Sequence, residues 1–300
     1  MAWAANLFWS GCASDHESAM TKYSRTYDCP PTLTDTQVLE FCKKGFLMLD
    51  GVVPDEINRR SLDYCNEHPD GEPSAILREP WFMDNVICHP QAAGAIRCLL
   101  GADFGLPILM SNHRVKTPMP AQNWHRDGGS QLSYDLHYLQ VFYYPEACSV
   151  EMGPTELLPG SHFLFSHSTY MGHYGAIRGS YRAAAPAGSI FITNYAIWHR
   201  RSASSVPGLR NLLKYNYFRT TAPQRDWIRE PDFDFATTDY ALHGAPTFRQ
   251  QFRDCSDSAQ LFLWLCGKSD QFHVLGGQSW PIPANRLDIP FGTPEGLLKH

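Results

Sequence analysis

The chain has 300 residues, of which 43% are hydrophobic, and a formal net charge of −5. This composition allows one large domain with a sizeable core, and so mild a charge gives no reason to expect nucleic acid or an anionic membrane as a partner. The nine cysteines form no C-x-x-C pair, which favours free, mostly buried thiols in a reducing cytoplasm over a zinc ribbon. No uncharged apolar run approaches the ~20 residues needed to span a bilayer, so we expect a soluble, cytoplasmic protein.

Residues 1–33 show no clear periodicity and end in Cys29-Pro30-Pro31, a break that predicts a loosely ordered leader. The first residues are apolar but lack the basic start and the long apolar stretch of a secretory signal. We therefore expect a single domain over residues 34–300.

Two helices and a strand are predicted at the start of this domain. Thr34 offers a capping side chain to a first helix, which should end near Gly45. The apolar run 46–53 is bounded by turn residues and predicts a strand. A second helix should follow over 54–68, because proline suits the first helical turn and a Pro-Asp-Gly sequence stops the helix.

The pattern changes to short β-branched or aromatic runs from about residue 104. Gly, Pro and Asn clusters separate these runs, as in an antiparallel sandwich or barrel. The predicted strands lie within 106–116, 136–144, 154–158, 188–193 and 212–219. A short buried helix is expected over 258–266. The fold class is therefore mainly β with flanking helices.

One segment offers two metal ligands at a spacing of two residues. His125 and Asp127 would point to the same face of a strand and bring an imidazole and a carboxylate to one point. A third ligand must come from elsewhere, and His199 lies at the end of an apolar strand downstream. Two histidines and one carboxylate are the ligands of non-haem iron(II) oxygenases. Without further support, His125 could equally be a core histidine, and His199 a residue at the rim of the barrel.

Arg210 follows His199 by eleven positions and raises the specificity of the pattern. A loop that turns at Pro207-Gly208 and leads into a strand would bring this arginine back beside the metal. A buried guanidinium can hold a carboxylate with two parallel hydrogen bonds. The alternative is an ordinary arginine at the start of a strand, paired with one of the acidic residues.

These motifs occur together in an order that resembles the phytanoyl-CoA dioxygenase-like family. The resemblance covers roughly residues 34–220. It rests on Gln122-x-x-His125-x-Asp127, the segment Gly153–His162, Gly188, Trp198-His199, Arg210 and the early segment Lys44–Val52.

The resemblance implies a double-stranded β-helix, also called a jelly roll or cupin-like barrel, in which the two histidines and the aspartate ligate Fe(II). It further implies that Arg210 holds the C5 carboxylate of 2-oxoglutarate. Thr155 and Gln122 match positions that often contact this co-substrate, although a plain strand residue and a turn side chain are the alternatives. His162 belongs to a turn that shapes the barrel, and we do not expect it to be a ligand.

The activity implied by the resemblance is the oxidation of a small-molecule substrate by O₂. The reaction would be coupled to the decarboxylation of 2-oxoglutarate to succinate and CO₂. Asp127 favours hydroxylation over halogenation, because related halogenating enzymes have a small residue at that position. Desaturation and ring formation are the alternative reaction outcomes. We expect a monomer or homodimer with no nucleic-acid or membrane partner.

The substrate is poorly defined by the sequence, and other functions compete. Arg200 and Arg201 could contact an acidic substrate, but solvated loop charges are the favoured interpretation, and Arg126 should point away from the metal. A cupin-type isomerase usually has H-x-H where this chain has Asp127. A non-catalytic metal- or small-molecule-binding barrel is the other alternative.

Overall fold

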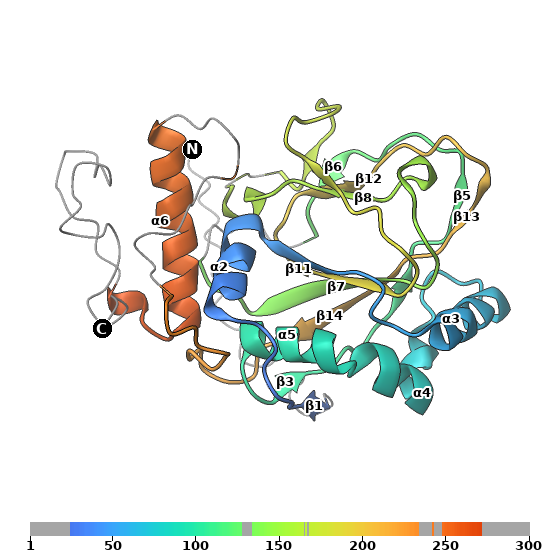
Figure 1. Cartoon of the computed structure of the whole chain (residues 1–300). Coiled ribbons are helices and arrows are strands. Elements are labelled where there is room, and N and C mark those ends of the chain that lie inside the picture. The colour runs from blue at the N-terminus through green and yellow to red at the C-terminus, as the bar shows by residue number, and fades with distance from the viewer. Residues whose placement is uncertain are drawn as a thin grey trace, which may run out of the picture.

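The computed structural model describes residues 25–127, 134–164, 166, 168–233, 242 and 248–271. Within these ranges, two antiparallel sheets lie one above the other, and helices cover the outer face of the larger sheet (Figure 1). The metal-ligand candidates lie between the two sheets. None of the helices in the described part of the chain is long and apolar enough to cross a membrane.

The larger sheet carries most of the core. Its strands follow the order β1-β3-β14-β7-β11-β2, with β4 paired to β14. Their bounds are β1 Thr26–Tyr27, β2 Phe46–Leu49, β3 Phe104–Gly105, β4 Ser111–Asn112, β7 Tyr138–Tyr144, β11 Ser189–Asn194 and β14 Leu213–Phe218.

The smaller sheet follows the order β10-β8-β12-β6-β9, and a separate ribbon pairs β13 with β5. Their bounds are β5 Val115–Thr117, β6 Trp124–His125, β8 Thr155–Leu157, β9 Tyr170–Met171, β10 Tyr181–Arg182, β12 His199–Arg201 and β13 Gly208–Arg210. Among the described strands, no pairing joins the two main sheets into a closed barrel. The mainly β class with flanking helices is confirmed, and the double-stranded β-helix stays an interpretation.

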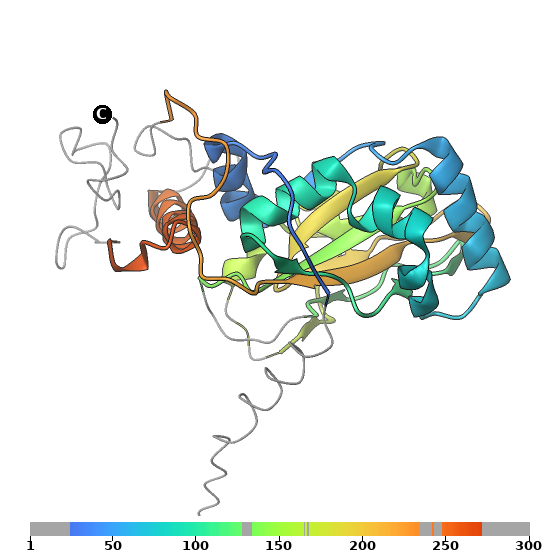
Figure 2. The ribbon, with the colours of Figure 1, turned by 90° about the horizontal axis from the view of Figure 1, so that it is seen from below.

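The helices lie mostly across the larger sheet, as the view from below shows (Figure 2). They are α2 Asp35–Lys44, α3 Asp55–Glu67, α4 Pro80–Phe82, α5 Pro90–Leu100 and α6 Phe248–Leu265, with short helical turns at Ser74–Arg78, Met83–Ile87, Val150–Met152, Ser161–Phe163 and Ser269–Gln271. Apolar residues of α5 belong to the same hydrophobic core as Val141 and Tyr143 of β7. These two residues lie on the side of β7 that faces the helices, and both are fully buried.

The alternation of side chains along β7 separates this outer core from the space between the sheets. Phe142 and Tyr144 point the opposite way from Val141 and Tyr143, because successive strand residues face opposite sides. Phe142 stacks on Phe191 of β11, with ring centroids 4.5 Å apart. Both faces of β7 are therefore buried, which explains its nearly continuous apolar sequence.

Local sequence signals explain the ends of α2. The Thr34 side chain accepts a hydrogen bond from the Gln37 backbone N–H, while the Gln37 side chain accepts one from the Thr34 N–H. This reciprocal capping box satisfies two N–H groups that the helix leaves without partners. Gly45 ends the helix with φ +80°, a left-handed conformation that costs little without a Cβ. The predicted helix over 34–45 is confirmed, as is the one over 54–68.

Several other predictions need correction. The expected strand over 106–116 is wrong as a single strand. Its residues contribute to two short strands, β4 and β5, which pair with β14 and β13 respectively. Pro107, which has no N–H to donate, precedes both strands. The expected strand over 46–53 ends at Leu49. The helix expected over 258–266 begins ten residues earlier, at Phe248. Helix α5 was not predicted.

The predicted leader overlaps the described residues only in part. Residues 1–24 lie outside them. Thr26 and Tyr27 pair with Gly105 and Phe104, and Leu33 is buried in the core. From Thr26 onward the chain is therefore part of the folded domain, because β3 offers an edge to which this segment adds a strand.

Candidate metal centre

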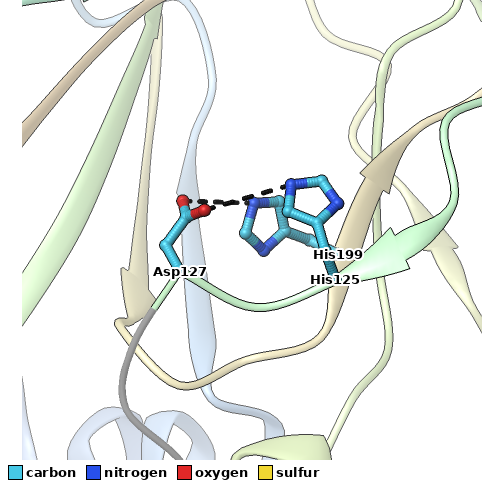
Figure 3. A group of neighbouring side chains, drawn as sticks. All are labelled: His125, Asp127 and His199. Atoms are coloured by element: carbon cyan, nitrogen blue, oxygen red, sulfur yellow. Dashed lines mark ion pairs between the residues drawn. The ribbon is translucent and has the colours of Figure 1, made fainter. Parts of the chain in front are cut away.

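Strand pairing brings together the residues that the sequence places far apart. In the smaller sheet, His199 at the start of β12 lies directly opposite His125 at the end of β6. Their ring centroids are 4.4 Å apart. Asp127 lies two residues beyond His125, in a bend after the strand, and its carboxylate faces both imidazoles (Figure 3). The three predicted ligands therefore meet at one point.

Their ligand atoms are close enough to share one metal ion. One such atom from each residue lies within 4.8 Å of the other two. His199 Nε2 is 3.5 Å from Asp127 Oδ2, and His125 Nε2 is 4.0 Å from Asp127 Oδ1. Two imidazole nitrogens and one carboxylate on one side of a centre leave the opposite side open for further ligands.

Backbone carbonyls orient both imidazoles. His125 Nδ1 lies 2.9 Å from the Asn123 carbonyl oxygen, and His199 Nδ1 lies 3.0 Å from that of Ile197. A carbonyl only accepts hydrogen bonds, so Nδ1 of each ring carries a proton and Nε2 is the ring atom left to bind a metal at the centre. Burial lowers the pKa of His125, and the charge of His199 lowers it further, so the neutral form that binds metals is favoured.

Two polar side chains of the larger sheet hold the Asp127 carboxylate. Gln140 Nε2 donates to Asp127 Oδ2 at 2.7 Å, and Lys214 Nζ donates to the same oxygen at 3.1 Å. Burial alone would raise the pKa of Asp127. The interactions with His199, Lys214 and Gln140 outweigh burial and hold this pKa below its ordinary value. The carboxylate is therefore ionised and able to bind a cation.

Arg210 is a buried cation with donor capacity to spare. Its side chain is only 1% exposed, and it donates through Nη1 to the Gly153 carbonyl oxygen. Its Nε is buried and has no hydrogen-bond partner among the described residues. An unsatisfied buried donor is costly, so this guanidinium fits an acidic ligand.

Thr155 and Gln122 occupy different environments. Thr155 is buried on β8, on the same side of the strand as the core residue Leu157, and its N–H donates to the Tyr144 hydroxyl at 3.1 Å. Gln122 is exposed, and its Oε1 accepts from the Arg201 N–H at 3.1 Å. This bond ties the segment before β6 to the end of β12. Contact of either residue with a co-substrate stays a prediction.

Arg200 corrects one prediction. It is not a solvated loop charge, because its side chain is buried and its Nε donates to Glu156 Oε2 at 2.7 Å. Its guanidinium also lies over the ring of Trp124. It occupies the outer side of the smaller sheet, since His199 before it faces the centre. Arg126 points away from the centre, as predicted, and donates to the backbone carbonyls of Leu164, Ser166 and Ser168.

Three polar residues near the centre were missed by sequence reasoning. Gln140 and Lys214 hold Asp127, and His113 follows β4. The pKa of His113 is lowered to about 4, first by burial and then by the charges of Lys214 and Arg210, so it is neutral near pH 7. Gln140 interrupts the apolar strand β7 at a buried position, which was an available signal. Lys214 lies in the alternating strand β14, where a polar residue is ordinary and gives no such signal.

His162 lies outside the centre, as predicted. Its ring is buried against Gly45, and Nε2 lies 3.0 Å from the Cys42 carbonyl oxygen. It therefore connects the turn after β8 to α2.

Comparisons with known proteins find a likeness of fold. No family model matches the chain, and no curated protein matches it either. The chain is similar to HygX from Streptomyces hygroscopicus with iron bound, at 18% identity and a TM-score of 0.52, over 71% of this chain and 95% of HygX. HygX with nickel and 2-oxoglutarate bound matches at 19% identity and a TM-score of 0.51, over 72% and 96%. The non-heme alpha ketoglutarate dependent carbocyclase SnoK from nogalamycin biosynthesis matches at 17% identity and a TM-score of 0.50, over 66% and 90%.

Proposed function

We propose that the chain is an Fe(II)- and 2-oxoglutarate-dependent oxygenase of the phytanoyl-CoA dioxygenase-like family, built on a double-stranded β-helix. The observation that carries this proposal is the cluster of His125, Asp127 and His199, with both Nε2 atoms turned toward one carboxylate. The fold shared with HygX, which binds iron and 2-oxoglutarate, supports the same assignment.

The donor set fits iron(II), and Arg210 fits the co-substrate. The two imidazoles and the Asp127 carboxylate would hold the ion, while Gln140 and Lys214 keep that carboxylate ionised and oriented. The buried Arg210, with an unsatisfied Nε, would bind the distal carboxylate of 2-oxoglutarate. Bound iron would supply O₂ activation coupled to the loss of CO₂ from 2-oxoglutarate.

Hydroxylation of a small molecule is the outcome we propose. Asp127 supplies a carboxylate ligand at the position where related halogenating enzymes have a small residue. Its presence favours transfer of oxygen to the substrate. A carbocyclase such as SnoK has a similar fold, so ring formation is the second candidate. The product decides between them, because hydroxylation adds one oxygen atom to the substrate whereas ring closure removes two hydrogens. We further propose that the enzyme acts in the cytoplasm as a monomer or homodimer.

The metal and co-substrate assignment can be tested without knowing the substrate. Under anaerobic conditions, the purified protein should develop a weak visible charge-transfer band when Fe(II) and 2-oxoglutarate are added together. The His199→Ala variant should lose this band. His173→Ala is the matched control, because His173 is exposed and lies outside the ligand cluster. A missing band in the wild-type protein, or a band that persists in His199→Ala, contradicts the proposal. A protein that binds iron but gives no band with 2-oxoglutarate would instead be a cupin-like metal-binding protein or isomerase.

A further inference from the structure

A cavity of about 560 Å³ opens beside the candidate metal centre. It lies against β7 and β14 and under the segment before β4, and Asp127 is one of its lining residues. Its volume is within the range of pockets that bind small molecules. A molecule in this cavity would therefore lie next to the carboxylate of the proposed iron site.

Much of the cavity lining is apolar, beside the polar residues Ser111, Gln140 and Asn216. Ile108 and Leu109 line the cavity and are 52% and 69% exposed, and Tyr138 is 45% exposed. Tyr195 and Phe218 add aromatic surface to the lining. Large apolar side chains left in water beside a cavity favour a ligand with an apolar or aromatic body, because binding removes their surfaces from water.

The inner end of the cavity carries the Lys214 ammonium, paired with the Asp127 carboxylate. Lys214 lies on β14 between Leu213 and Tyr215, which face the outer core, so its own side chain projects between the sheets. It lines the cavity, and its side chain is 20% exposed. An ammonium group has three N–H donors, and the one acceptor recorded for Lys214 among the described residues is Asp127 Oδ2. Donors therefore remain for a ligand.

The co-substrate does not account for Lys214. The distal carboxylate of 2-oxoglutarate already has a candidate partner in Arg210, which is almost fully buried and is not among the described residues that line this cavity. Lys214 instead lines the cavity beside Asp127, where a primary substrate would lie next to the proposed metal centre. A cation in this position attracts an anionic group and repels a cationic one.

We infer that the primary substrate is a small organic acid, with an apolar or aromatic body under Ile108 and Leu109 and an oxyanion bound by the Lys214 ammonium. This inference rests on the proposed function for the position of the iron. Lys214 would then select the substrate by charge and place the body of the molecule beside the metal centre.

Two dyes that differ in one charged group test this inference. Anilinonaphthalene sulfonate carries a sulfonate on an aromatic body, and phenylnaphthylamine has the same rings without it. Each dye is titrated by fluorescence into protein loaded with Ni²⁺ and 2-oxoglutarate. Lys214→Met should weaken binding of the sulfonate dye by about tenfold, the effect of losing one charge-assisted hydrogen bond, and should leave the neutral dye unchanged.

Two further variants locate the effect. Lys116→Met removes an exposed lysine outside the cavity lining and should change neither dye. Leu109→Ser should weaken both dyes alike, because it removes apolar contact and no charge. If Leu109→Ser affects neither dye, the cavity does not bind them, and the inference is wrong.

Other outcomes overturn the inference in distinct ways. Equal weakening of both dyes by Lys214→Met would mean that Lys214 only supports the shape of the site. A loss of 2-oxoglutarate affinity as large as that in Arg210→Ala would assign Lys214 to the co-substrate. Failure of the proposed function shows separately, as absence of the iron charge-transfer band. The dye titration without metal still reports whether Lys214 selects an acid.

Discussion

Replacement of Arg210 by alanine should separate co-substrate binding from metal binding. Arg210 is 1% exposed, and its buried Nε has no partner among the described residues. Loss of one member of a buried, hydrogen-bonded charge pair costs roughly 2–5 kcal/mol, so 2-oxoglutarate should bind roughly 30- to 5,000-fold more weakly. Iron affinity should change little, because Arg210 contacts none of the three ligands.

The assay is an anaerobic titration of the Fe(II)-loaded protein with 2-oxoglutarate, followed by the charge-transfer absorbance. Arg210→Lys keeps the charge but not the two-pronged geometry, so its affinity should lie between those of the wild type and Arg210→Ala. Arg178→Ala is the matched control, since Arg178 is exposed and distant in sequence from the ligands. Thermal unfolding of each variant shows whether the fold is intact.

Two results would refute the reasoning. An unchanged 2-oxoglutarate affinity in a folded Arg210→Ala protein would remove the proposed role. Loss of iron binding in the same variant would mean that Arg210 supports the metal centre itself.

Three further predictions concern stability. Gly45→Ala places a Cβ 2.5 Å from His162 Nδ1 at a residue with φ +80°. Denaturant titration should therefore show a loss of about 2–5 kcal/mol in the free energy of unfolding. Gly71→Ala is the control and should change this free energy little, because no atom lies within 4 Å of the added Cβ. Asp35→Ala should cost about 3–5 kcal/mol by the same measurement, because this fully buried carboxylate accepts four hydrogen bonds from residues 225–230. Burial lowers the pKa of His162 to about 4 in the folded protein. Below pH ~6.5 the unfolded chain therefore binds more protons than the folded protein does. The free energy of unfolding should fall by up to about 3 kcal/mol between pH ~6.5 and 4. A flat pH profile, or a His162→Gln variant with the same slope as the wild type, would contradict this last prediction.

The sequence was sufficient where structure depends on neighbouring residues. The capping box at Thr34 and the left-handed Gly45 are local signals, and they predicted both ends of α2. His125 and Asp127 are two residues apart, so their convergence could also be predicted, although Asp127 lies in a bend beyond β6 and not in the strand. His199 and Arg210 were selected by spacing and by resemblance to a family, because no local property distinguishes them.

Only the tertiary structure decided which distant residues meet. The pairing of β6 with β12 places His199 opposite His125, and β14 brings Lys214 to Asp127 across the space between the sheets. Arg200 was misassigned because its partner Glu156 is supplied by the adjacent strand β8. Strands that are distant in the chain decide which side of a strand is buried. They also supply the charged side chains that pair with a buried polar group. For this reason the three ligands of the candidate metal centre could be named from the sequence, while the lysine that points to an acidic substrate could not.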